Sequence, residues 1–165
     1  MRRISPWHAG IVTAVLVIAS LTTAFAVHGA PATCRRNQLG VRPNGSEGTA
    51  GTIHGAWVFT NLSDASCLLN GYASLQLYGK AGRPIHTSVQ DDLSPSPSDV
   101  TLAPGASATF LSNYSDVSSG KPCPTSFVAE ITAPGTVASQ FIPASLAPCD
   151  GVVHVSAVRA GVHHP

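Results

Sequence analysis

The sequence predicts an all-β domain, a sandwich or a barrel, from its alternating apolar residues, its turn spacing and its prolines. Apolar and polar residues alternate with a period of two, the spacing of a strand with one buried face. Turn residues separate these runs about every 8 to 12 positions, as in sandwiches and barrels. The 13 prolines among 165 residues would interrupt helices repeatedly. Charged residues make up 10% of the chain, fewer than long exposed helices require.

Four runs carry the strand pattern most clearly. In residues 52–60 one face holds three large apolar side chains, and Trp57 is expected to be the central aromatic residue of the core. Residues 100–102 and 106–111 form a further pair of strands around a Pro-Gly turn. The apolar positions of the four runs are Ile53, Trp57 and Phe59; Leu75 and Leu77; Phe127, Ala129 and Ile131; and Val153 and Val155.

Residues 91–99 are predicted to be an exposed loop. Serine and proline alternate there, and proline lacks the N–H that a central strand needs. The three aspartates of this loop lack the alternating spacing of a calcium-binding loop. Loops at the ends of a sandwich are common contact regions. The candidate partner-binding residues are Asp91, Asp92 and Asp99 in this loop, with Asn113 and Tyr114 in the segment 112–121.

The N-terminus carries a predicted export signal. Two arginines precede an apolar run over residues 11–26, and two Ala-x-Ala sites follow, ending at Ala26 and Ala32; signal peptidases cleave this pattern. Residues 1–32 are therefore expected to be a signal peptide. The alternative is a membrane anchor, because residues 11–27 approach the length needed to cross a bilayer. The rest of the chain divides into a sandwich domain, residues 33–158, and a disordered tail, residues 159–165.

Four cysteines, Cys34, Cys67, Cys123 and Cys149, follow the export signal. Thiols outside the cytoplasm oxidise and persist as disulfides, whereas a zinc site would require a close pair such as Cys-x-x-Cys. Sequence alone permits three pairings. We favour Cys34–Cys67 and Cys123–Cys149, because each ties a loop to the strand beside it. Loops of that length would each stabilise the fold by roughly 3–4 kcal/mol.

Several short motifs lie between these cysteines. They are Val58-Phe59-Thr60-Asn61, Cys67-Leu68-Leu69-Asn70-Gly71-Tyr72, and Leu102-Ala103-Pro104-Gly105-Ala106-Ser107-Ala108. Their arrangement, over nearly all of the mature chain, resembles a family of actinobacterial exported proteins known only as a domain of unknown function. The resemblance implies an immunoglobulin-like antiparallel β-sandwich with two disulfides, and it implies no activity. Tyr72 is expected to act as a corner tyrosine, with its ring in the core and its hydroxyl bonded to backbone.

Charge excludes a nucleic-acid partner. After residue 32 the chain has seven basic and eight acidic residues, a formal charge of −1, so no basic face forms for nucleic acid or for an anionic membrane. The pair Arg35-Arg36 is too small to hold a polyanion at physiological salt. We expect membrane contact only through the N-terminal segment.

The sequence favours a binding module over an enzyme. No Gly-x-Ser-x-Gly elbow occurs, and His54, His86 and His154 have no acid close to them in the sequence, so we expect no catalytic residue and no cofactor. The alternative is an extracytoplasmic copper or zinc protein, with His163 and His164 as candidate ligands; a hydrolase is a third interpretation. The favoured function is a non-catalytic module of the cell envelope that binds an envelope protein or a glycan.

Overall fold

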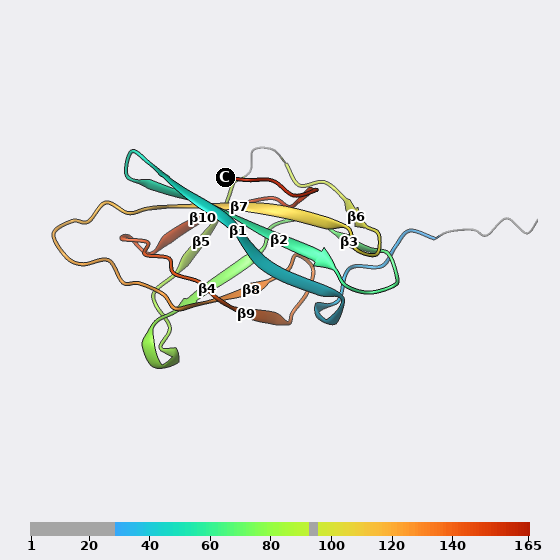
Figure 1. Cartoon of the computed structure of the whole chain (residues 1–165), viewed down its shortest axis with the longest axis horizontal. Coiled ribbons are helices and arrows are strands. Elements are labelled where there is room, and N and C mark those ends of the chain that lie inside the picture. Colours follow the sequence, from blue (N-terminus) through green and yellow to red (C-terminus); the bar gives the residue numbers. More distant parts are fainter. Residues whose placement is uncertain (1–28, 93–95) are drawn as a thin grey trace, which may run out of the picture.

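Strands in two facing layers make up the fold (Figure 1). The structure is a computed structural model that describes residues 29–92 and 96–165. Two short 3-10 helices, Arg36–Gln38 (η1) and Lys80–Gly82 (η2), accompany the strands. The strands are Leu39–Thr49 (β1), Thr52–Asn61 (β2), Cys67–Leu69 (β3), Ser74–Tyr78 (β4), Ser88–Asp92 (β5), Val100–Leu102 (β6), Ser107–Ser115 (β7), Val128–Thr132 (β8), Ser139–Pro143 (β9), Val152–Ser156 (β10) and Arg159–Ala160 (β11).

One large and one small sheet form the layers. The large sheet has the order β1-β2-β7-β10-β5, with β11 pairing with β7, and the small sheet has the order β4-β8-β9. Strands β3 and β6 form a separate pair near one end of the sandwich (Figure 1). The predicted all-β fold is confirmed. One pair of strands departs from the antiparallel expectation, because β5 runs parallel to β10; no hairpin joins these two strands, so no turn dictates their direction.

The core is centred on aromatic side chains of β2 and β7. Trp57 and Phe110 are cross-strand partners whose rings are nearly parallel, with centroids 6.2 Å apart, and Phe59 packs on Phe110 at 5.5 Å. Leu77 and Ile131 of the small sheet belong to the same buried cluster. Trp57 is thus the core aromatic residue that the sequence predicted. Burial of such rings supplies much of the hydrophobic stabilisation of a small domain.

Phe127 does not lie on the buried strand face that the sequence predicted for it. Its neighbours in the pattern, Ala129 and Ile131, are buried, but Phe127 is 51% exposed. It lies just before β8, and the Lys80 ammonium is 5.7 Å from its ring centroid. The alternation of apolar and polar residues predicts a buried side chain only within the strand itself, and Phe127 lies outside the strand.

Asn61, at the end of β2, links three segments of the chain by hydrogen bonds. It is fully buried, and its amide Nδ2 donates to the carbonyls of Ala65 (2.8 Å) and Leu102 (2.9 Å). Its Oδ1 accepts hydrogen bonds from the backbone N–H (3.0 Å) and the hydroxyl (2.8 Å) of Ser63. Its backbone N–H and C=O pair with residues 106 and 105. One side chain therefore holds the Phe-Thr-Asn motif against the Leu-Ala-Pro-Gly motif.

Both predicted disulfides, Cys34–Cys67 and Cys123–Cys149, are present and use all four cysteines. The first holds the segment before β1 against β3, where the Cys34 N–H also donates to the Leu68 carbonyl at 2.9 Å. The second joins the segment before β8 to the segment before β10. Stable disulfides indicate an oxidising, extracytoplasmic environment.

Strands β1, β3 and β9 were missed by the sequence pattern, and the end of β5 was assigned to a loop. β1 contains Pro43-Asn44-Gly45, a turn-like triplet, and it is an edge strand, where proline is tolerated. β9 carries few apolar residues in alternation. Asp91 and Asp92 belong to β5, paired with Val155 and Ser156 of β10, because main-chain pairing on an edge strand does not depend on the side chains.

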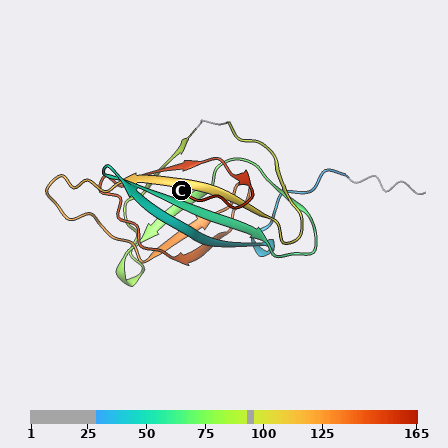
Figure 2. The same cartoon turned by 45° about the horizontal axis from the view of Figure 1, so that its top comes forward.

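The predicted disordered tail, residues 159–165, is instead attached to the large sheet. β11 pairs with β7, and the Thr109 hydroxyl donates to the Gly161 carbonyl (2.8 Å) and accepts from the His163 N–H (3.1 Å). Asn44 Nδ2 donates to the His163 carbonyl at 2.9 Å. Figure 2 shows the C-terminus over β2 and β7. The outward side chains of this sheet include apolar Val58, which is fully buried, so the tail covers a face that would otherwise expose apolar surface.

The predicted signal peptide or anchor lies mostly outside the described residues, since residues 1–28 are not among them. Within residues 29–92 and 96–165, no helix is long and apolar enough to cross a membrane.

Replacing Asn61 by Ala should lower the free energy of unfolding by about 3 kcal/mol, because it removes a fully buried amide that donates to the Leu102 carbonyl and accepts from the Ser63 N–H. Denaturant titration measures this change. The control is Asn70→Ala, whose amide donates to Asp99 on the surface and should change stability by less than about 1 kcal/mol. Equal effects from the two variants would contradict the role assigned to Asn61.

Candidate functional site

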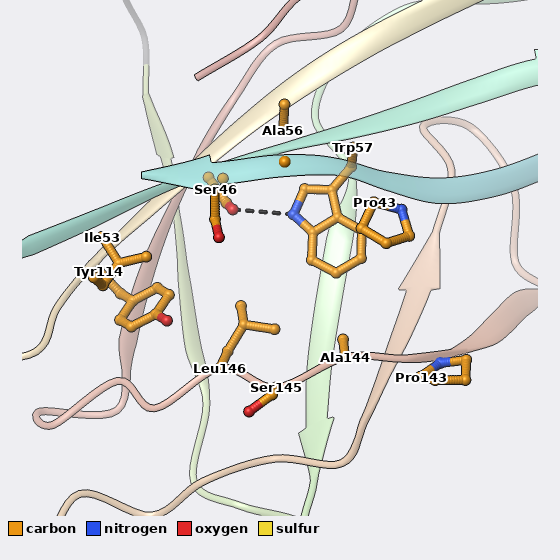
Figure 3. A pocket seen from close by; sticks show the side chains of 13 residues that line it. Pro43, Ser46, Ile53, Ala56, Trp57, Tyr114, Pro143, Ala144, Ser145 and Leu146 are labelled. Atoms are coloured by element: carbon orange, nitrogen blue, oxygen red, sulfur yellow. Dashed lines mark hydrogen bonds between the residues drawn. The ribbon is translucent and has the colours of Figure 1, made fainter. Parts of the chain in front are cut away.

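A cleft of about 280 Å³ opens between the two sheets (Figure 3). One wall comes from β1, β2 and β7, and the other from residues 143–146, which begin at the last residue of β9. In Figure 3, Pro43 and Trp57 extend from the large sheet toward the segment that carries Ala144, Ser145 and Leu146. The two layers therefore share this cleft, as is common for ligand sites.

Trp57 presents its indole edge to the cleft and is oriented by a hydrogen bond. Its Nε1–H donates to the Ser112 hydroxyl at 3.0 Å, and both residues are buried. Gly55, the cross-strand partner of Ser112, lines the same wall. A Cβ added at Gly55 would lie 3.1 Å from Ser112 Oγ. The lack of a side chain at Gly55 therefore leaves room for this hydrogen bond.

The opposite wall is held by Ser126, which is buried. Its hydroxyl donates to the Ala144 carbonyl and accepts from the Leu146 N–H, both at 2.9 Å. Its backbone N–H also donates to the Leu146 carbonyl at 2.8 Å. These three hydrogen bonds fix the segment that faces Trp57, so the cleft is preformed.

A bulge in β1 shapes the rim. The register shifts between Pro43 and Ser46, and Gly45 has a φ of +95°, a conformation that favours glycine. The Asn44 side chain connects the bulge to Arg42 and, as described above, to the tail. The Pro-Asn-Gly triplet was the sequence signal for this rim, but it reads as a turn unless β1 is recognised as an edge strand.

The cleft has an uncharged lining. Among the described residues, those that line it include Trp57, Tyr114, Pro43 and Pro143, together with hydroxyl groups such as that of Ser112; none is Asp, Glu, Lys, Arg or His. Aromatic and proline rings offer apolar contact, and the hydroxyls offer directional hydrogen bonds. Such a lining suits an uncharged ligand, because a charged one would lose hydration without gaining an opposite charge.

Asn113 and Tyr114 do not form one contact surface, contrary to the sequence-based expectation. They are neighbours on β7, so their side chains point to opposite faces. Tyr114 is 8% exposed and lines the cleft; burial raises the pKa of its hydroxyl, which also bonds to the Ala147 backbone. Asn113 faces outward between His54 and His154. A pattern of alternation predicted the strand but not which face it buries.

The three predicted aspartates are also separated. Asp91 and Asp92 lie on β5, whereas Asp99 accepts a hydrogen bond from the Asn70 side chain. Tyr72 differs from the expected corner tyrosine, because its buried hydroxyl has no hydrogen-bond partner among the described residues. Burial raises the pKa of Tyr72, and the carboxylates of Asp91 and Asp92 raise it further.

The histidines of the described residues lie apart, with His86 in the segment before β5 and the others on the outer side of the large sheet or in the tail. His54 and His154 point away from the core. His163 Nε2 lies 2.8 Å from the Ala160 carbonyl, and His164 Nδ1 lies 3.5 Å from Asn44 Nδ2. In residues 29–92 and 96–165, no group of three or more His, Cys, Asp or Glu residues is placed to hold a metal ion.

A second exposed surface is the outward side of the small sheet. Glu130 lies at its centre, in register between Gln76 and Phe141. The hydroxyls of Ser139 (2.5 Å) and Tyr78 (2.6 Å) donate to its carboxylate and hold the pKa of Glu130 below its ordinary value. The ring centroids of Tyr78 and Phe141 are 5.9 Å apart, and Phe141 is 62% exposed. We call this surface the Glu130 face.

The two layers, the disulfides and the uncharged cleft define a disulfide-stabilised β-sandwich domain. The chain belongs to the family described as a domain of unknown function (DUF4232), which matches residues 34–159. That match starts at the first disulfide cysteine and reaches β11, so it includes both layers. Neither the curated proteins nor the solved structures contain a significant match to the chain.

Substituting Gly55 by Ala should displace the Ser112 hydroxyl from Trp57, because the new Cβ would approach Ser112 Oγ at 3.1 Å. We expect a loss of about 1–2 kcal/mol in unfolding free energy and a shift of the Trp57 indole N–H resonance. The control is Gly82→Ala, where no atom lies within 4 Å of the added Cβ. Its φ of +67° makes alanine strained there, so stability falls in the control too, but the indole resonance should stay in place. An unchanged resonance in Gly55→Ala would contradict this account of the wall.

Tyr78→Phe should raise the pKa of Glu130 toward its ordinary value of about 4.5, because it removes one of the two donors. A carboxyl group with a lowered pKa in the folded state stabilises the fold above its unfolded pKa, and this contribution is lost as pH falls through the folded value. The wild-type protein should therefore lose more stability below about pH 4.5 than the variant does.

An NMR titration of the Glu130 carboxyl carbon measures this pKa. Tyr114→Phe is the control, since that hydroxyl bonds to the Ala147 backbone. A Glu130 pKa that is the same in Tyr78→Phe and in the wild type would show that the Tyr78 hydrogen bond does not hold the carboxylate.

Proposed function

We propose that this protein is an exported, non-catalytic binding module of the cell envelope, and that its cleft takes a small uncharged ligand. The observation that carries this proposal is the lining of the cleft, which combines aromatic and proline rings with serine hydroxyls and has no charged side chain among the described residues. The cleft is held in shape on both walls, so little ordering is required when a ligand enters.

Export is supported by two independent features. The predicted signal at residues 1–32 directs the chain across a membrane, and the two disulfides persist only in an oxidising compartment. A partner in the cell envelope, either a peptide segment of another protein or a glycan, follows from that location. A volume of about 280 Å³ is at the lower end for ligand pockets, so it fits one peptide side chain or one sugar ring.

Binding is favoured over catalysis by the chemistry of the cleft. A serine nucleophile needs a neighbouring base to take its proton. The neighbour of Ser112 is the Trp57 indole N–H, which only donates. The described lining residues supply no histidine or carboxylate for this role. The hydroxyls of the cleft are therefore assigned to ligand recognition.

The test is an NMR titration of the mature protein with matched neutral and charged probes. The neutral probes are N-acetylglucosamine and dipeptides blocked at both ends; the charged ones are glucosamine and the unblocked dipeptides. We expect at least one neutral probe to shift the Trp57 indole resonance and its charged analogue to bind more weakly.

Ser145→Trp, at an exposed position of the cleft, should block binding by filling the entrance. Ser66→Trp, on an exposed turn outside the cleft, should leave it unchanged. The proposal is wrong if no neutral probe shifts Trp57, or if binding survives in Ser145→Trp.

A further inference from the structure

We propose that the Glu130 face is a second binding site, for a neutral polysaccharide chain. This inference goes beyond the ligand of the cleft, because the site lies on the outward side of the small sheet and uses different side chains. Only Pro143, at the end of β9, belongs to the borders of both surfaces.

The face is graded from polar to apolar across three cross-strand rows. Strand register places the members of each row side by side on β4, β8 and β9, pointing away from the core. None of the nine side chains is buried. The rows are Ser74, Thr132 and Ser139; Gln76, Glu130 and Phe141; and Tyr78, Val128 and Pro143.

The Glu130 face is exposed to solvent, whereas the outward side of the large sheet is covered. There the C-terminal segment covers Ala56, Val58 and Thr109, which are all buried. On the small sheet, by contrast, Phe141 is left 62% exposed beside Tyr78. A large aromatic side chain that a rigid sheet holds in solvent loses little conformational entropy on binding, which favours a role in recognition.

A sugar ring complements this arrangement. It has an apolar C–H face, which stacks on aromatic rings, and a rim of hydroxyl groups, which need hydrogen-bond acceptors. Glu130 Oε1 accepts from Ser139 and Oε2 accepts from Tyr78, so each oxygen keeps a further lone pair for a ligand hydroxyl. The two protein hydroxyls thus orient the carboxylate without using up its capacity.

Charge and size select the class of glycan. Glu130 is the one ionised group among the nine side chains of the face, and the Arg36 guanidinium lies beside the face, with its Nε donating to the Ser139 carbonyl at 3.3 Å. The surface therefore has too little net charge to select either a polyanion or a polycation. Neighbouring strands are about 4.8 Å apart, which makes the face about 10 Å wide across three strands. This width accommodates more than one ring of an extended, flat chain.

The test is a titration of the isotopically labelled mature protein with soluble hexamers of β-1,4-linked glucose and of β-1,4-linked N-acetylglucosamine, monitored by amide NMR. We expect at least one hexamer to shift resonances of β8 and β9. Phe141→Ala should weaken its binding about tenfold, and Glu130→Gln should also weaken it. Val137→Ala, at a fully exposed apolar residue outside the face, is the matched control and should bind as the wild type does.

Ser145→Trp separates the two proposals, because it blocks the cleft and should leave hexamer binding at the Glu130 face intact. Loss of hexamer binding in that variant would place the hexamer in the cleft and overturn the second site. The second site is also overturned if neither hexamer shifts β8 or β9, if Phe141→Ala binds with unchanged affinity, or if a hyaluronan hexamer, which is anionic, binds equally well.

Discussion

The buried amide of Asn61 is the interaction on which the rest of the sandwich depends. An amide group carries two donors and an acceptor, and placing it in the core is costly unless all are paired. Here they are paired with the turn at residues 63–65 and with Leu102 of β6. Because that turn leads directly into Cys67, the same network sets the position of the first disulfide. The motifs that characterise the sequence are therefore in contact in the folded protein.

The outward side of the large sheet is covered, and that of the small sheet is exposed to solvent. This difference determines where binding surfaces can form. Val58 and its neighbours make the outward side of the large sheet apolar, and the C-terminal segment covers it through Thr109 and Asn44. Asn44 belongs to the bulge of β1, so the cover and the rim of the cleft are connected. The small sheet has polar and aromatic outward residues, which are stable in water without a cover.

Two surfaces of different chemistry result. The cleft lies between the layers, is preformed by Ser112 and Ser126, and carries no charged side chain among the described residues. The Glu130 face lies on the outside and has one ionised carboxylate held by two hydroxyls. The surfaces adjoin at Pro143. According to the two proposals above, one molecule binds a polysaccharide chain at the Glu130 face while the cleft takes a side group or a separate small ligand.

Local features of the sequence determined the all-β class and the position of Trp57 and Phe59 in the core, because alternation and turn residues are properties of short segments. They favoured the observed cysteine pairing among three possible ones. The tertiary structure alone decided which of Asn113 and Tyr114 faces the cleft, that Asp91 and Asp92 join a strand, and that residues 159–165 cover a sheet. Each of these depends on contacts between segments far apart in the chain. Pro43 and Pro143, which line the cleft from β1 and β9, are 100 residues apart, and no local pattern links two such positions.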